Sequence, residues 1–304
     1  MKKLDFHTHI TDETVTVEES AAYFQDLCIR HGLEGIVIHA ATVNSAGLHP
    51  DCNEKALEIS RLLGGAPAFA SLHHERDFVE QTKEYMTQGF RGIKLLEGKP
   101  SLYRHYGYGF EHPRFEPFFA YAEEQSIPLL IHNNDPAANW DVANATEDLI
   151  QKGWIYDSTM PTQEDFFRTL EDVLARHPNL RAAIAHFGFY SNDLPRATRL
   201  MERYPNLRMD LTPALIIFHE LSKTPAETKE FLLRYQDRLI FGTDVSNRIE
   251  DKVRTLNDKK HAVMTAFFEG EGDYDFGKYS VCGMGLEESV LSKIYYENAM
   301  KFMA

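Results

Sequence analysis

The sequence is poor in cysteine, with three among its 304 residues. Cys28, Cys52 and Cys282 lie far apart, their number is odd, and no two of them form a C-x-x-C pair. These features argue against a disulfide framework, and such isolated thiols are typical of a protein in a reducing compartment. We therefore expect a cytoplasmic location.

Long apolar runs and an excess of positive charge are also missing. No stretch reaches the roughly 18 apolar residues that a membrane-spanning helix needs, and only Leu4 and Phe6 are apolar before His7, too few for a secretion signal. Lys and Arg number 32 against 46 Asp and Glu, which gives a formal net charge of -14. We therefore expect a small-molecule substrate as the partner, and neither nucleic acid nor a membrane surface.

Glycine-rich phosphate loops are absent too. Gly107 and Gly109 are followed by His112 where the dinucleotide-binding motif needs a third glycine, and no Walker-type loop occurs. An open doubly wound sheet that binds nucleotides carries such a loop after an early strand. Its absence disfavours that alternative for this chain.

What the sequence does contain is a regular alternation of short apolar segments with stretches of helical periodicity, such as 18–32 and 163–178. The eight predicted strands are residues 4–7, 35–40, 66–74, 91–96, 128–132, 181–186, 207–211 and 238–244. Their nearly continuous apolar character indicates parallel strands that are buried on both faces. We predict one α/β domain over residues 1–304, a distorted (β/α)8 TIM barrel.

The joints between helices and strands repeat in the second half of the chain. RHPNLR (176–181) and RYPNLR (203–208) are almost identical, and RYQDRL (234–239) is a looser third copy. In the first two the proline ends the helix before the strand begins. The least regular stretches are 97–112, 133–160 and 245–285, so we expect active-site loops after strands 4, 5 and 8.

Two histidines one residue apart open the chain in DFHTHI. In an extended strand, residues i and i+2 point to the same side, so His7 and His9 can bind one metal ion together. An H-x-H pair on a surface strand is the alternative interpretation, and this spacing alone does not separate the two.

Polar side chains at three later strand ends strengthen the metal hypothesis. His132 ends the apolar run IPLLI, His186 ends AAIA, and Asp244 ends LIFGT. The strand ends of a barrel converge on one face, and a carboxylate buried there needs a partner cation. Three imidazoles and one carboxylate, from His7, His9, His132 and Asp244, suit a catalytic zinc ion that keeps a position for water. His186 would reach the same mouth as a proton carrier or carbonyl polariser.

Six segments, taken in order, resemble the amidohydrolase superfamily: DFHTHI, GFRGIKLL, IPLLIH, PNLRAAIAHFG, RLIFGTD and LSKIYYENAMKFM. They are most similar to the branch that contains aminocarboxymuconate-semialdehyde decarboxylase, the resorcylate decarboxylases and pyrone-dicarboxylate lactonase. The resemblance runs the whole length of the chain. It implies a barrel with His7, His9, His132 and Asp244 as metal ligands and His186 as the active-site histidine. It also implies that the protein can form a homodimer.

The resemblance leaves the number of metal ions open. Lys94 stands where some members carry a carboxylated lysine that bridges two ions, whereas the most similar branch is usually mononuclear. We favour one divalent ion, with zinc as first choice and manganese, iron and nickel as alternatives by ligand type. Lys94 is then expected to contact a substrate carboxylate, and Arg248, four residues past Asp244, is a second candidate anchor.

The reaction that the resemblance implies is hydrolysis of an amide, lactone or ester, in which Asp244 accepts a proton from a metal-activated water and His186 steadies the oxyanion. Relatives that decarboxylate aromatic or unsaturated acids need the same metal ligands, so decarboxylation is the alternative reaction. A binding protein on an inactive barrel is an alternative of another class, which the complete ligand set disfavours.

Overall fold

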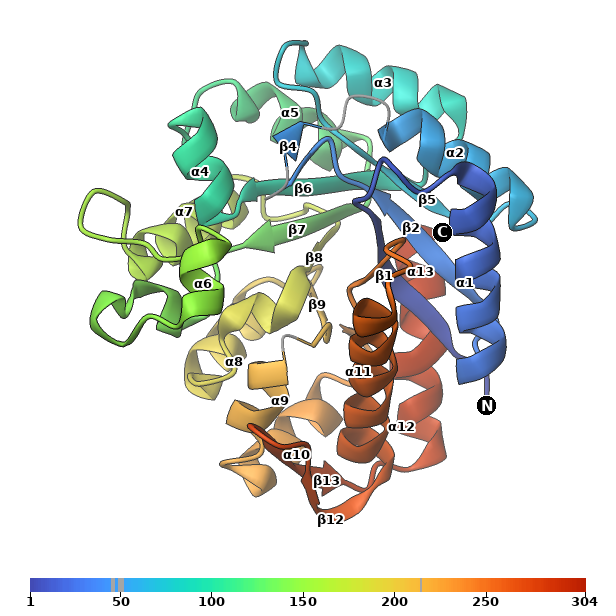
Figure 1. The fold of residues 1–304 in the computed structure, drawn as a ribbon. Helices are drawn as coiled ribbons and strands as arrows, with labels where there is room; N and C mark the ends of the chain where they lie inside the picture. The colour runs from blue at the N-terminus through green and yellow to red at the C-terminus, as the bar shows by residue number, and fades with distance from the viewer. Residues whose placement is uncertain (45–46, 49–51, 214) are drawn as a thin grey trace.

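A curved parallel sheet forms the centre of the computed structural model, which describes residues 1–44, 47–48, 52–213 and 215–304. Its strands follow one another around the sheet in sequence order (Figure 1). They are β1 (Leu4–Ile10), β2 (Gly35–Ala40), β5 (Ala68–Ser71), β6 (Gly92–Gly98), β7 (Leu129–Asn133), β8 (Ala182–Ile184), β9 (Arg208–Asp210), β10 (Leu239–Ile240) and β11 (Val245–Ser246).

Two short strands close the ring, and only the first of them, β10, lies within the predicted eighth strand 238–244. Leu239 of β10 pairs with Met209 of β9, and Val245 of β11 pairs with Thr8 of β1. Between these two strands, the amide of Asp244 donates to the carbonyl of His7 over 2.8 Å. This segment is thus bonded to β9 on one side and to β1 on the other, which confirms the (β/α)8 barrel. The break between β10 and β11 is one way in which the barrel is distorted.

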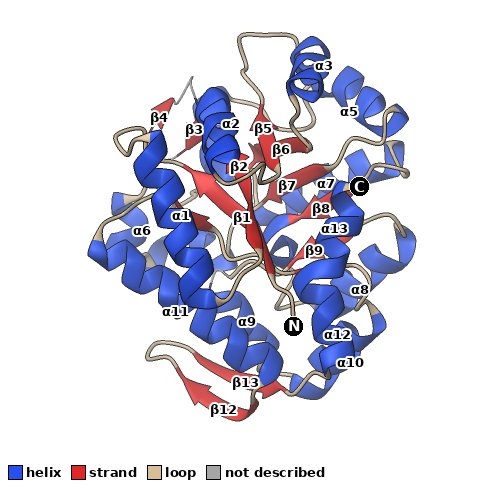
Figure 2. Cartoon of the chain, turned by 90° about the vertical axis from the view of Figure 1, so that its right-hand side faces the viewer, coloured by secondary structure: helices blue, strands red, loops and turns tan. Residues whose placement is uncertain are grey.

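Helices cover the outside of the sheet (Figure 2). They are α1 (Val17–His31), α2 (Cys52–Leu62), α3 (Phe78–Gln88), α4 (Pro100–Tyr106), α5 (Phe115–Glu124), α6 (Glu147–Gln151), α7 (Gln163–Arg176), α8 (Leu194–Arg203), α9 (Leu215–Leu221), α10 (Pro225–Arg234), α11 (Asp251–Glu269), α12 (Glu288–Ser292) and α13 (Asn298–Met303). Shorter elements are the 3-10 turns η1 (Ala137–Trp140), η2 (Val142–Asn144) and η3 (Ala185–Phe189), and the π-helical turn η4 (Lys293–Glu297), which joins α12 to α13.

Local sequence explains where the regular helices begin and end. Thr16 caps α1 and forms a capping box with Glu19, and Gly32 ends the helix in the left-handed conformation. Thr162 and Asp165 form the same box at the start of α7. Each cap satisfies amide groups that the first turn of a helix leaves without a partner.

Two apolar clusters form most of the core, and a third, small one consists of Ala41, Leu96 and Leu102. The larger one lies between the sheet and the surrounding helices. The smaller of the first two includes Phe6, Leu130, Ala183 and Ile240 from the strands and Phe302 from α13. Helix α13 therefore packs its apolar residues against those of the strands. Burial on both faces accounts for the continuous apolar runs of the sequence.

The segments expected as loops after strands 4, 5 and 8 contain more regular structure than the sequence suggests. Helix α4 follows β6, and the 19-residue helix α11 and a β-hairpin occupy most of 245–285. The hairpin consists of β12 (Glu271–Asp275) and β13 (Ser280–Met284), and a second one consists of β3 (Val43–Asn44) and β4 (Gly47–Leu48). Charged residues in α11 hide its helical period, because it carries lysines and aspartates on both sides of its apolar stripe.

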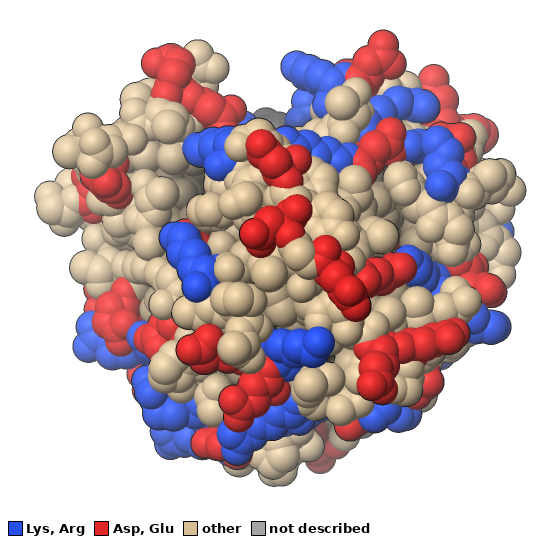
Figure 3. Space-filling view, turned by 90° about the horizontal axis from the view of Figure 1, so that it is seen from below, with Lys and Arg blue, Asp and Glu red and all other residues tan. Residues whose placement is uncertain are grey.

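One face of the molecule carries charged side chains of both signs (Figure 3). On the face in Figure 3, acidic and basic side chains are interspersed. Among the helices of the described residues, none is long and apolar enough to span a membrane.

Candidate metal centre

His7 and His9 project from β1 to the same side, as their spacing predicts. Their Nε2 atoms lie 2.8 Å apart, and both side chains are buried. On its other side, the Nδ1 atom of His7 contacts the carboxylate of Asp210 and lies 2.8 Å from the hydroxyl of Thr212. When Nδ1 carries the ring proton and donates it to Asp210, the lone pair of Nε2 is left facing His9.

Asp244 completes this side of the site from the segment between β10 and β11. Its Oδ1 lies 3.1 Å from Nε2 of His9 and 4.0 Å from Nε2 of His7. Its backbone has a φ of 56°, which is the left-handed region that few residues other than glycine adopt. Burial alone would raise the pKa of Asp244, but Lys260 and His9 hold that pKa well below its usual value. The carboxylate is therefore ionised.

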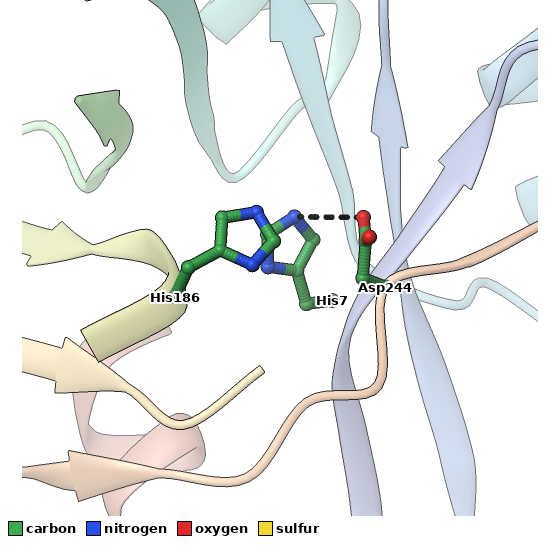
Figure 4. Close-up of side chains that lie close together, drawn as sticks. All are labelled: His7, His186 and Asp244. Carbon is green, nitrogen blue, oxygen red and sulfur yellow. Dashed lines mark ion pairs between the residues drawn. The ribbon is translucent and has the colours of Figure 1, made fainter. Parts of the chain in front are cut away.

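His186 approaches from the opposite wall, in the turn η3 that follows β8. It has a φ of 56°, and the next residue, Phe187, has a φ of 53°. Gly188 and Phe189 continue the run with φ of 60° and 58°. Four successive residues in the left-handed region are unusual, and such backbone strain is concentrated at functional sites. One ligand atom each of His7, His186 and Asp244 lie within 4.8 Å of one another, and Figure 4 shows these three side chains together.

His132 is placed next to His186 at the end of β7, with their ring centres 4.8 Å apart. Its Nε2 lies 3.1 Å from the carbonyl oxygen of Asn134 and 3.7 Å from a carboxylate oxygen of Asp135. The structure thus brings His132 to the same mouth, with its Nε2 engaged by the following loop. Its role as a metal ligand stays a prediction.

Lys94 and Arg248 occupy different depths of the site. Lys94 is 0% exposed, and its Nζ lies 3.2 Å from Nε2 of His7, so it forms part of the floor beneath the histidines. Burial lowers the pKa of Lys94 to about 8. Arg248 is half exposed at the mouth, with one guanidinium nitrogen 3.1 Å from Glu250. Contact of either residue with a substrate stays a prediction.

The site opens into a cleft of about 860 Å³ at the carboxyl ends of the strands. His9, His132, His186 and Asp244 line it together with Arg248. Other walls come from the segments after β1, β2 and β9, with Thr14, Ala41 and Leu215 among the lining residues. The segments after β6, β7 and β11 contribute Lys99, Leu102, Asp135, Trp154 and Tyr279. These last three segments are the ones in which the sequence predicts active-site loops, and they line much of the cleft even though parts of them are helical.

Two buried carboxylates that support the site were not selected from the sequence. Asp210 contacts Nδ1 of His7, as described above. Asp5 accepts hydrogen bonds from the amides of His7 and Thr243 over 3.1 and 3.0 Å and from the Thr243 hydroxyl, so it ties β1 to the segment that carries Asp244. Burial raises the pKa of Asp5 to about 6. A carboxylate within an apolar run, as in LDFH and LRMDL, is the signal that could have identified both.

A glycine allows this close packing. A Cβ atom added to Gly242 would lie 2.6 Å from Cβ of His7 and 2.9 Å from a carboxylate oxygen of Asp210. Any side chain at this position would therefore displace His7 or its carboxylate partner. The segment before Asp244 can pass this close to β1 only because residue 242 has no side chain.

The donor set fits a divalent cation. Burial lowers the pKa values of His7, His9 and His186, which keeps their imidazoles neutral near pH 7 and able to offer lone pairs. Within the described residues, the buried Nδ1 of His186 has no hydrogen-bond partner. Neutral imidazoles that face one another beside an ionised Asp244 form a nitrogen and oxygen donor set of the kind that zinc and other transition metals bind.

Comparison with solved structures shows the same fold in several enzymes. The probable 2-pyrone-4,6-dicarboxylic acid hydrolase of Acinetobacter baumannii, solved with citric acid bound, aligns with a TM-score of 0.61 and 12% identity over 100% of this chain and 99% of its own. The 2,6-dihydroxybenzoate decarboxylase from Rhizobium has a TM-score of 0.56 and 15% identity over 100% and 98% of the two chains. A dihydroxybenzoic acid decarboxylase from Polaromonas, with bound manganese, has a TM-score of 0.57 and 12% identity over 99% and 96%.

Among curated protein sequences, no match is found. The sequence model of the amidohydrolase family, by contrast, matches residues 5–303, which is nearly the whole chain and includes every residue of the site described above. The chain therefore belongs to the amidohydrolase family.

Proposed function

We propose that this protein is a metal-dependent hydrolase that cleaves an amide, lactone or ester bond of a small carboxylate-bearing molecule. The observation that carries the proposal is the convergence of His7, His9, His186 and Asp244 at the base of a cleft of about 860 Å³. A divalent ion held there would lower the pKa of a water molecule and polarise the substrate carbonyl. Zinc is the first choice, and manganese, iron and nickel suit the same ligands.

Asp244 is proposed as the general base. It is ionised, it lies at the cleft, and only one of its carboxylate oxygens is within 3.1 Å of His9. It can therefore accept a proton from the attacking water and pass it to the leaving group. The Nζ of Lys260 lies 3.7 Å from its other oxygen and donates to its main-chain carbonyl over 2.6 Å, which holds the carboxylate in place.

His186 is proposed to act on the substrate oxygen. Its Nδ1 has no partner in the described structure, and its ring lies between His7 and His132, with centroid distances of 5.4 and 4.8 Å. From this position it can donate a hydrogen bond to an oxygen on which negative charge develops. As a metal ligand, the same nitrogen would have to offer a lone pair instead of a proton, so the two roles exclude each other at a given nitrogen.

Basic residues around the cleft support a substrate that carries a carboxylate. Lys94, at the floor of the site, and Arg248, at the mouth of the cleft, are proposed to contact this carboxylate. Lys99 adds a third cation on the wall, where its Nζ lies 4.5 Å from the ring centre of Trp154 and 3.6 Å from Asp135. A single ion remains the proposal, with a second ion through a carboxylated Lys94 as its alternative.

Decarboxylation of an aromatic or unsaturated acid is the second candidate reaction. The observation in its favour is the fold shared with two dihydroxybenzoate decarboxylases, one of them with bound manganese. Parallel assays of the metal-loaded protein separate the two. Release of acid from lactones, esters or amides supports hydrolysis, whereas release of carbon dioxide from hydroxybenzoic acids contradicts it.

We also propose a cytoplasmic location and a homodimeric assembly. Three cysteines that are widely spaced in the sequence support a reducing, cytoplasmic environment. A homodimer is proposed from the resemblance to relatives that form one, and the partner that the cleft accommodates is a small molecule.

A further inference from the structure

Three arginines stand at the starts of three neighbouring strands, at the end of the barrel opposite the metal centre. Arg181 directly precedes β8, Arg208 is the first residue of β9, and Arg238 directly precedes β10. They come from the three similar joints RHPNLR, RYPNLR and RYQDRL, a repeat that the proposed reaction does not use. We call these three residues the arginine site.

Strand register brings the three arginines together. Arg208 pairs with Ala183 across β9 and β8, and the amide of Met209 donates to the carbonyl of Arg238 over 3.0 Å, which places Arg238 beside Arg208. Arg181 lies two residues before Ala183, so an extended backbone directs both to the same side of the sheet. Ala183 belongs to the inner apolar cluster that also contains Phe302 of α13.

Phe302 of α13 is a shared neighbour of two of these side chains. The guanidinium carbon of Arg208 lies 5.3 Å from the centre of the Phe302 ring, and that of Arg181 lies 5.8 Å from it. Both guanidinium groups therefore lie against the same aromatic ring. The site thus concentrates positive charge on a chain whose formal net charge is -14.

The described residues place no carboxylate in an ion pair with this charge. In the described part of the chain, none of the three guanidinium groups forms an ion pair, and Asp237, next to Arg238 in sequence, pairs instead with Lys293 at 2.9 Å. The arginines donate only to backbone carbonyls: Arg181 to Lys301 over 2.8 Å, Arg208 to Asn206 over 3.2 Å, and Arg238 to Met201, Tyr204 and Pro205 over 2.8, 3.2 and 3.3 Å.

These carbonyl contacts leave donors unused. A guanidinium group has five N–H donors, and the buried Nε of Arg208 has no partner in the described structure. Burial lowers the pKa of Arg208, and Arg181 and Arg238 lower it further by repulsion. Arg238 lies beside this pair, with its guanidinium carbon 5.0 Å from the ring centre of Tyr235. A partly buried charge without a counterion is costly.

We propose that the arginine site binds a small oxyanion of the phosphate class at the N-terminal face of the barrel. Guanidinium groups bind tetrahedral oxyanions through paired N–H donors, and three adjacent ones match a dianion in charge. The site is separate from the metal centre, and it is independent of the reaction proposed there. The phosphate group can belong to free inorganic phosphate or to a phosphorylated small molecule.

Calorimetric titration of the metal-loaded protein tests the proposal. Inorganic phosphate is the first probe and glycerol 3-phosphate the second, and tighter binding of the second identifies a phosphate ester as the source. We expect saturable binding that weakens at least about tenfold in Arg181→Gln and in Arg208→Gln. Arg234→Gln is the matched control, because Arg234 begins the third joint but pairs with Glu202 on the surface. Its affinity should equal that of the wild type.

The two variants also separate binding from folding. Arg181 makes a single hydrogen bond to a carbonyl, so Arg181→Gln should fold even if Arg208→Gln does not, and thermal melts verify this. Selenium positions in crystals soaked with selenate provide a second measurement and should lie between Arg181 and Arg208. The proposal is overturned if the wild type shows no saturable binding, if Arg181→Gln folds and binds phosphate as the wild type does, or if selenate occupies only the metal centre.

Discussion

The carboxylate of Asp210 contacts Nδ1 of His7, and both side chains are completely buried. This contact joins β9 to β1 beneath the cleft and determines which nitrogen of His7 faces His9. A carboxylate in this position fixes the orientation of a metal-binding imidazole and makes it a stronger ligand. Asp210 is therefore a positioning residue of the proposed metal centre.

Asp210→Asn should weaken metal binding by about 10- to 100-fold, because the amide retains the shape of the side chain but is a weaker acceptor for the Nδ1 proton of His7. Competition with a chromogenic chelator measures the dissociation constant. Asp237→Asn is the control, since Asp237 is an exposed carboxylate on the neighbouring β9–β10 joint. Equal metal affinity of Asp210→Asn and the wild type would show that the contact with His7 does not support the site.

Asp244→Asn should lower kcat by about 10²- to 10⁴-fold on any substrate found by the parallel assays, because the proposed base is lost. The metal content of the same preparation must be measured, since Asp244 is also a proposed ligand. Asp275→Asn in the exposed strand β12 should leave kcat unchanged. Undiminished turnover by Asp244→Asn would exclude this residue as the base.

Gly242→Ala should lower both the free energy of unfolding and the affinity of the site for metal. The added methyl group would lie 2.6 Å from Cβ of His7, and relief of such a contact costs about 1 to 3 kcal/mol of unfolding free energy. Gly35→Ala is the matched control in β2, where the nearest atom would lie at an ordinary 3.6 Å. Denaturant unfolding and metal titration of both variants provide the comparison, and equal behaviour would contradict the close approach seen here.

The stability of the protein should depend on pH through His261 in α11, which is buried and stacked on His31 with ring centres 3.8 Å apart. Burial lowers the pKa of His261 from 6.5 to about 3. The unfolded chain therefore binds more protons below pH 6.5, and the stabilisation is lost progressively as the pH falls from 6.5 toward 3.

Denaturant unfolding at pH 7 and pH 5 measures this effect. His261→Gln should lose less stability between the two values than the wild type does, whereas His219→Gln, a change at a partly exposed histidine, should behave as the wild type. An identical loss in His261→Gln and the wild type would mean that His261 does not contribute.

Much of the fold could be predicted because its signals are local. Strand β2 has the predicted bounds, and the helix 163–178 differs from α7 by two residues at its end. Strand β11 was not predicted, since it lies beyond the predicted strand 238–244 and follows the left-handed turn at Asp244. Helix α11 was not predicted because its charged residues resemble a solvated loop.

The candidate site was predicted only in part, because register determines which side chains meet. The H-x-H spacing places His7 and His9 together, and barrel topology places His186 and Asp244 near them. Neither shows that Asp210 faces His7, since a strand of three residues gives no alternation from which to infer direction. Likewise, the full burial of Lys94 beneath His7 follows from packing across several strands and not from its own neighbours.

The central claim is that His7, His9 and their neighbours hold a divalent metal ion, and elemental analysis of the purified protein tests it most directly. The wild type, as purified or after dialysis against zinc or manganese, should contain about one ion per chain, and His7→Ala together with His9→Ala should abolish this uptake. A folded wild-type protein that contains no divalent ion and takes up none would contradict the claim.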